Sequence, residues 1–143
     1  MKLFFILSTL IVCPLISPIL QAQEWIPKRI VGIPYPALAA QARIVGTIEL
    51  QCIIDNDGSV NSTKVLSMSG PGPVVILAEA CEENAKKWRF VQKDSTVTTG
   101  SPNVILKYTF ILEGVTQARR YEEFVFEFPN SVFVTSEAPL AQP

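Results

Sequence analysis

The chain has 143 residues, 48% of them hydrophobic and 17% charged, with 12 basic against 13 acidic residues. That length suits about one domain, and the apolar content can form a core, so an intrinsically disordered chain is excluded. Because the net charge is -1 and no basic run exceeds two residues, a nucleic-acid or anionic-lipid surface is not expected. Histidine is absent, which removes the commonest general base and metal ligand, so hydrolase and zinc sites are not expected.

Residues 1–22 have the pattern of an export signal. Lys2 supplies a positive start, a long apolar stretch follows, and Leu20-Gln21-Ala22 ends in the small residue that signal peptidase prefers. We therefore predict an exported protein whose signal peptide is cleaved after Ala22.

Two alternatives to cleavage stay open. A retained membrane anchor needs about 18 to 20 apolar residues, and Pro14 and Pro18 interrupt the stretch available here. A lipoprotein would use Cys13, which follows apolar residues, although Val12 is a poor residue before a lipidated cysteine.

The first elements after the signal are an extended segment and a short helix. Prolines hold residues 23–34 extended, and Pro36 suits the first turn of a helix, where its missing N–H costs nothing. Residues 37–43 have high helical propensity, and Gly46 ends this unit.

A β-hairpin follows from residue 47. Asp55-Asn56-Asp57-Gly58 is a turn in which Gly58 takes a positive φ, and the return strand over residues 60–67 departs from strict alternation, which predicts a bulge or a twist. A calcium loop is not expected, because Ile53 and Lys64 fall where its carboxylates are required. The first strand has period two, with these apolar residues on one face: Ile48, Leu50, Cys52 and Ile54.

A longer helix and a last strand complete this part of the chain. Apolar residues recur every three or four positions from Val74 to Trp88, which predicts a helix with one face on a sheet. Trp88-Arg89-Phe90 closes the helix and anchors the core. Residues 94–102 form a loop, and residues 103–113 alternate as a strand that Gly114 ends.

The order and spacing of three motifs resemble a known family. Tyr35-Pro36, Asp57-Gly58-Ser59-Val60 and Trp88-Arg89-Phe90 are similar to signatures of the C-terminal domain of TonB, the periplasmic energy transducer, over about residues 30–114. The resemblance implies an α+β fold for residues 35–114. In it, a small antiparallel sheet, made of a β-hairpin and a third strand, is covered on one face by two helices.

The resemblance also implies a binding function without a cofactor. Family members recognise a short extended peptide of an outer-membrane transporter by adding it to the last strand, which is β-augmentation. The segment before Tyr35, from Arg29 to Pro34, is implied as a further contact. The residues implied to bind the partner on the last strand are Val104, Ile105, Leu106, Lys107, Tyr108, Thr109 and Phe110.

Residues 115–136 extend beyond the family pattern. Residues 124–128 and 132–134 have the pattern of a strand, a turn and a strand, with Phe124, Phe126 and Phe128 on one face. We expect this extension to lengthen the sheet or shield its edge, and the alternative is a new recognition surface. If it pairs with the last strand, it occupies the edge that a transporter peptide would need. Residues 137–143 are expected to be disordered.

Cys52 and Cys81 remain after cleavage, and two outcomes are open for them. An exported protein permits a disulfide between them, whereas two buried thiols are also common. A helix lying on a sheet usually holds its Cα atoms beyond the ~4.4 to 6.8 Å that a disulfide tolerates, which disfavours the bridge.

The function expected from the sequence is a free-standing periplasmic binding module linked to transmembrane transport. Residues 23–34 reach about 40 Å when fully extended, which is too short to carry the domain across a periplasm from an inner-membrane anchor. The alternative is a structural envelope protein whose sheet edge pairs with a second copy. An enzyme is not expected, because no nucleophile motif occurs and no histidine can activate a serine.

Overall fold

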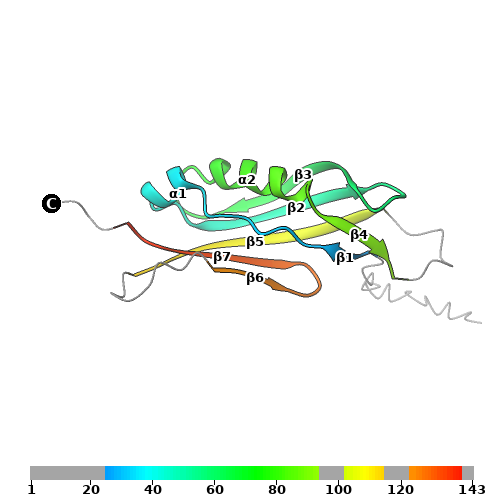
Figure 1. Ribbon diagram of the computed structural model, residues 1–143. Coiled ribbons are helices and arrows are strands. Elements are labelled where there is room, and N and C mark those ends of the chain that lie inside the picture. The colour runs from blue at the N-terminus through cyan, green and yellow to red at the C-terminus, as the bar shows by residue number, and fades with distance from the viewer. Residues whose placement is uncertain (1–24, 94–101, 115–122, 140–143) are drawn as a thin grey trace, which may run out of the picture.

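The computed structural model describes residues 25–93, 102–114 and 123–139 of the chain (Figure 1). The fold is α+β, as predicted. The elements in chain order are β1 (Trp25–Arg29), α1 (Ala37–Gln41), β2 (Gly46–Ile54), β3 (Val60–Ser69), α2 (Val75–Ala85), β4 (Arg89–Gln92), β5 (Asn103–Glu113), β6 (Glu123–Glu127) and β7 (Ser131–Glu137).

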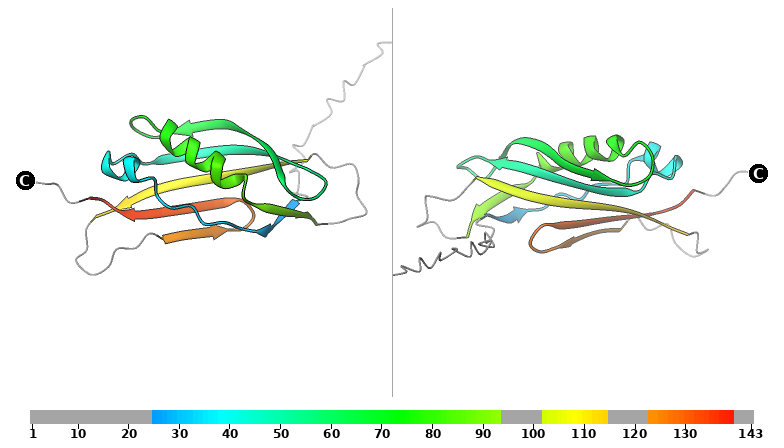
Figure 2. Two further views of the ribbon diagram at one scale, coloured as in Figure 1. Left: turned by 45° about the horizontal axis from the view of Figure 1, so that its top comes forward. Right: turned by 180° about the vertical axis from the view of Figure 1, so that it is seen from behind.

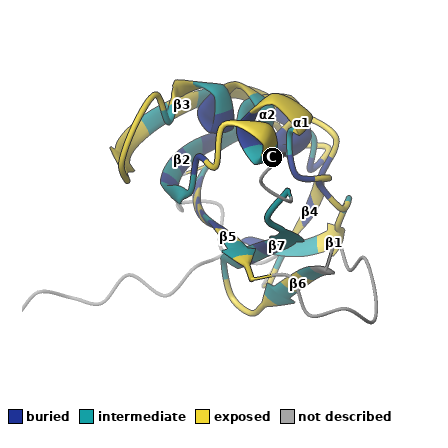
Figure 3. Ribbon diagram, turned by 90° about the vertical axis from the view of Figure 1, so that its left-hand side faces the viewer, coloured by how far each residue is buried: buried dark blue, intermediate teal, exposed yellow. Residues whose placement is uncertain are grey.

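The main sheet has five strands in the order β3-β2-β5-β7-β6, and β1 and β4 form a separate antiparallel pair. Neighbours in the main sheet are antiparallel except β5 and β7, which run parallel. Both helices lie on one face of the sheet, as Figure 1 and the view from behind in Figure 2 show. Seen end on, the sheet is curved, and the helices and the pair β1–β4 lie on its concave side (Figure 3).

The hairpin β2–β3 confirms the alternation predicted from the sequence. Its four inward residues, Ile48, Leu50, Cys52 and Ile54, are all buried. The turn bonds Gly58 N to Asp55 O at 2.9 Å, and Gly58 has a φ of 83°, as expected. The register shifts twice along the pair, so β3 carries two bulges where the sequence predicted a bulge or a twist.

The helix α2 ends three residues earlier than predicted, because residues 86–88 lie between the helix and the next strand. It ends at Ala85, and Trp88 is fully buried after the helix. Arg89 and Phe90 begin β4, which pairs with the extended segment β1 on one side. On the other side the Phe90 amide donates to the Gly58 carbonyl at 2.8 Å. The aromatic anchor was predicted correctly, but β4 was missed.

The C-terminal extension is a strand, a turn and a strand, as predicted, and it enlarges the sheet. Phe124 and Phe126 are half-buried, whereas Phe128 lies in the turn with 70% of its surface exposed, so its predicted place on their face is wrong. Disorder from residue 137 is also wrong for residues 137–139, because β7 includes Glu137 and the Ala138 amide donates to the Glu113 carbonyl at 2.9 Å.

The predicted export signal, residues 1–22, lies outside the described residues, as do residues 94–101 of the predicted loop. Within the described ranges, no helix has the length and apolar character needed to cross a membrane.

Candidate functional site

The strand predicted to bind a partner, β5, is inside the sheet. Four of its seven predicted binding residues, Val104, Leu106, Tyr108 and Phe110, are buried toward the helices. On the opposite face, Ile105 and Lys107 are exposed and Thr109 is half-buried. One side of β5 pairs with β2 and the other with β7, whose register joins Lys107–Glu113 to Ser131–Glu137. The expectation of an open edge over Val104 to Phe110 is therefore wrong from Lys107 onward, whereas Val104 to Leu106 lie outside the register with β7 and their role stays a prediction.

The strand β7 closes β5 through hydrogen bonds and through the core. The Lys107 amide donates to the Asn130 carbonyl at 2.9 Å, and the bond from Ala138 to Glu113 closes the other end. Val132 and Val134 are buried to 0% and 1% exposure. Each such valine stabilises the folded state by about 1.5 to 3 kcal/mol, so detaching β7 would cost several kcal/mol.

The outermost strand on this side is β6. Successive residues of a strand point their backbone groups to opposite sides. Because the Asn130 carbonyl bonds β5, every second residue counted from Asn130 also faces β5, and the residues between them bond β6. Phe133 is one of these, and its partner on β6 is Val125. The backbone groups of Phe124 and Phe126 consequently point away from the sheet. No other strand in the described residues pairs with this side of β6. We call Phe124–Glu127 on this side the β6 edge.

The side chains of the β6 edge lie on two faces. Phe126 packs its ring against Trp88 with centroids 5.5 Å apart, and a Cβ added to Gly32 would lie 3.8 Å from Phe124 Cγ. Val125, 38% exposed, and the exposed Glu127 lie on the face away from the helices. The strand therefore has an anchored inner face and an accessible outer face.

The opposite end of the main sheet is β3, and it is irregular. Its pairing with β2 is interrupted between Glu49 and Leu50 and between Ile53 and Ile54. Lys64 is exposed in the middle of the strand. Bulges and lysines are two devices by which proteins discourage pairing at sheet edges. This edge is therefore less suited to strand addition than the β6 edge.

The extended segment before α1 is held by one buried amide. Asn84, 4% exposed, donates from Nδ2 to the Val31 and Gly32 carbonyls at 3.0 and 3.1 Å. Its Oδ1 accepts from Trp88 Nε1 at 2.9 Å and from the Tyr108 hydroxyl at 3.0 Å. Because every polar atom of this amide has a partner, the segment is fixed between α2, β5 and the hairpin β6–β7.

The predicted contacts Arg29 and Pro34 lie at opposite ends of this segment, and both are exposed. Arg29 is the last residue of β1, and its partner across the pair is Arg89. Pro34 lies between two buried residues, Ile33 and Tyr35. Their role as partner contacts stays a prediction.

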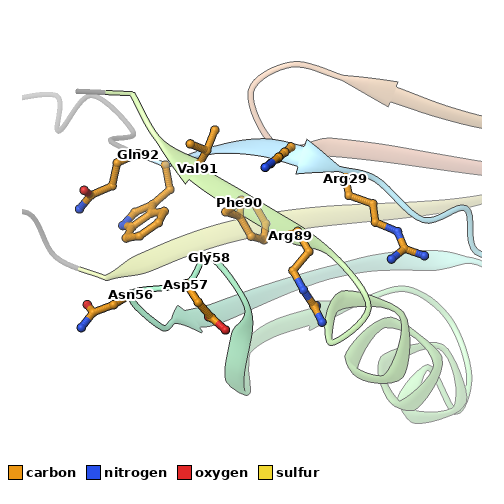
Figure 4. Close-up of a pocket in the computed structure, with 10 residues that line it drawn as sticks. Arg29, Asn56, Asp57, Gly58, Arg89, Phe90, Val91 and Gln92 are labelled. Carbon is orange, nitrogen blue, oxygen red and sulfur yellow. The ribbon is translucent and has the colours of Figure 1, made fainter. Parts of the chain in front are cut away.

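A cavity of about 510 Å³ lies between β1, β4 and the turn of the hairpin β2–β3 (Figure 4). Lys28, Arg29 and Arg89 provide its positive charges, and Asp57 provides a negative charge. Ser59 donates to Asp57 Oδ1 from its hydroxyl at 2.5 Å and its amide at 2.9 Å. These bonds and the nearby Arg89 lower the pKa of Asp57, so its carboxylate stays ionised.

One of the cations that line the cavity already has partners within the chain. Arg89 Nη1 donates to the Trp88 carbonyl at 2.8 Å and to the Lys86 carbonyl at 3.4 Å, so this guanidinium already binds the end of the α2 region. The lining residues contain no cysteine or serine that a base could activate. The charged groups of the cavity can pair with a charged group of a ligand.

Both cysteines of the described residues are buried, and their thiols are free. The bridge left open by the sequence is therefore not formed in this structure. Burial raises the pKa of Cys52 to about 12 and raises that of Cys81 well above its usual value. Such thiols are protonated and inert at neutral pH. In the described ranges, no cluster of three or more Cys, Asp or Glu side chains could hold a metal ion.

Sequence reasoning missed two features of this region, namely the β6 edge and the role of Asn84. The alternation in residues 124–128 predicted a strand but not its place in the sheet. Asn84 sits among apolar residues on the inner face of α2, and that position is a signal from which a buried polar contact could have been inferred.

The chain is similar to members of one known protein family. Residues 31–109 match the family described as Gram-negative bacterial TonB protein C-terminal. The chain is also similar to the solution NMR structure of the Pseudomonas aeruginosa TonB CTD, with 24% identity and a TM-score of 0.42, over 71% of this chain and 95% of that one. No curated protein matches the sequence.

Proposed function

Since the chain belongs to the family of Gram-negative bacterial TonB C-terminal domains, we propose that it is an exported, non-enzymatic protein-binding module of the cell envelope. The export pattern of residues 1–22 supports a periplasmic location. The partner is an outer-membrane transporter or another envelope protein, so the module takes part in transmembrane transport. It needs no cofactor, nucleic acid or small-molecule substrate.

The proposal depends on one observation, the open ends of the main sheet. In the described residues, β3 and β6 each have one side without a neighbouring strand. A strand edge offers unpaired backbone N–H and C=O groups, which provide affinity for an extended peptide. The side chains that alternate along the strand provide specificity. The domain therefore supports capture of an extended segment by strand addition.

The electrostatic balance supports a protein partner. The chain is close to neutral, and exposed side chains of the outer sheet face include both charged and apolar groups, such as Lys107, Glu127, Ile105 and Val125. Mixed surfaces of this kind suit a polypeptide better than a polyanion.

The test is a crosslinking pull-down of the full chain from native envelope, read by mass spectrometry. We expect outer-membrane transporters or other envelope proteins to be recovered with the folded chain. A matched control carries Trp88→Asp, which places a charge in the core and should unfold the domain and abolish recovery. Recovery of a second copy alone would favour a self-associating envelope protein, and recovery of nothing would overturn the proposal.

A further inference from the structure

We propose that the partner of this protein docks at the β6 edge, and not at the last strand of the family fold, β5. This inference rests on the proposed function, because it specifies where the extended segment binds and what chemistry it has. Its first basis is that the C-terminal hairpin already occupies the outer side of β5 from Lys107 to Glu113.

Displacement of the hairpin β6–β7 by a peptide would cost free energy. Val132 and Val134 are part of the core, and Phe126 contacts the fully buried Trp88. A partner that displaced β7 would expose these residues to water while it competed with a strand held on the same chain. Strand addition is therefore expected beyond the hairpin, where the sheet ends.

Of the two ends of the main sheet, the β6 end is the regular one. The five pairs between β6 and β7 follow each other without a register shift, whereas the pairing of β3 shifts twice. The middle of β6 is Val125, whereas Lys64 lies in the middle of β3. An edge without bulges and with an apolar residue at its centre accepts an added strand more readily than one with two bulges and a central lysine.

The surroundings of the β6 edge specify the partner segment. On the inner side, the chain near Gly32 lies against Phe124, and Ile30 in the same extended segment is 39% exposed. On the outer side, an added strand would pass beside Val125 and Glu127. The segment should therefore be extended, with apolar residues alternating along it and a lysine or arginine opposite Glu127.

This chemistry disfavours a second copy of the chain as the occupant. A second copy of β6 has no lysine or arginine that could pair with Glu127, because its sequence is EFVFE. Opposite charges stabilise a strand pair, and such a pair would lack them here. A basic segment of another envelope protein has the complementary charge.

The experiment uses photocrosslinking amino acids at single positions of the full chain in native envelope. The probe replaces Val125 on β6 or Lys64 on β3, and the crosslinked peptides are mapped by mass spectrometry. We expect a crosslink from position 125 to an alternating apolar segment with a basic residue, and none from position 64. The same crosslink from position 64, or a crosslink from 125 only to a second copy, would overturn the inference.

A charge reversal provides a second measurement. Glu127→Lys should lower the yield of the crosslink from position 125 by about tenfold or more, because it opposes a basic segment. The matched control Glu79→Lys, on the exposed side of α2, should leave the yield unchanged. Equal yields in both variants would contradict the charge assignment. A crosslink to an envelope protein from position 64 but not from position 125 would refute only the choice of the β6 edge. No crosslink to an envelope protein from either position would refute the proposed function itself.

Discussion

The two halves of the main sheet are covered in different ways. The half made of β3 and β2 lies under the helices α1 and α2, whereas the half made of β7 and β6 lies under an extended segment and Trp88 (Figure 1). The helices α1 and α2 pack on β3 and β2 through apolar faces, and the residues of each face are close together in the sequence. The cover of the second half depends on the hydrogen bonds from Asn84 to residues 31–32 and on the ring contact between Trp88 and Phe126, and each of these contacts joins residues that are distant in sequence. The hairpin β6–β7 is therefore part of the core of the domain and not an appendage.

The largest expected effect comes from Val134→Asp. The change removes a buried apolar side chain and places a carboxylate in the core, which should lower the free energy of unfolding by more than about 4 kcal/mol. Urea unfolding followed by circular dichroism measures this loss. An unchanged midpoint would show that the hairpin half is independent of the helix-covered half.

Asn84→Leu should have the next largest effect. It removes four hydrogen bonds and leaves the buried Tyr108 hydroxyl and Trp88 Nε1 without their partner, at a cost of about 2 to 4 kcal/mol. Amide exchange should accelerate in β6 and β7 more than in β2, because the segment that covers the hairpin is released. Asn61→Ala, which removes exposed hydrogen bonds to Asp55, is the control and should change neither half.

A smaller effect is expected at alkaline pH. Burial raises the pKa of Tyr35 from 10.0 to about 12, and its hydroxyl donates to the Ile44 carbonyl. The raised pKa means that the folded state favours the protonated phenol, so this contribution is complete below pH 10 and is lost as the pH rises to about 12. Tyr35→Phe should reduce the slope of unfolding free energy against pH in this window. The same slope in the variant would assign the loss to other groups, such as the Cys52 thiol.

The smallest effect on stability is expected for Lys64→Val on β3. The exposed position should change the unfolding free energy by less than about 0.5 kcal/mol. Self-association should nevertheless increase, because the edge loses its charge and gains a β-branched residue. Light scattering at increasing protein concentration measures it, with Lys87→Val on the helix-covered side as the control. No difference between the two variants would show that bulges alone protect this edge.

Much of the fold was predictable because its signals are local. The alternation of Ile48, Leu50 and Cys52 predicted β2 and its buried face, and Gly58 predicted the turn. The alternation from Val104 to Phe110 predicted β5 equally well. These patterns report which face of an element is buried, and they contain no information about its neighbours within the sheet.

The candidate site was predictable only in part for the same reason. The resemblance named β5 as the binding strand, and the sequence raised the condition that the extension could cover it. Alternation in residues 124–126 is compatible with pairing to β5, to β3 or to another chain. The choice of β7 as the neighbour of β5 follows from burial of Val132 and Val134 in one core with Trp88, which no local pattern specifies.

The fold class, the hairpin, the two helices, the strand β5 and the family all follow from local sequence patterns, because periodicity, turn residues and motif spacing act over short stretches of chain. Only the tertiary structure decided the parallel pairing of β5 with β7, the place of β6 at the end of the sheet and the pairing of β1 with β4. Strand order depends on which apolar faces can share one core, and that is a property of the whole packed chain.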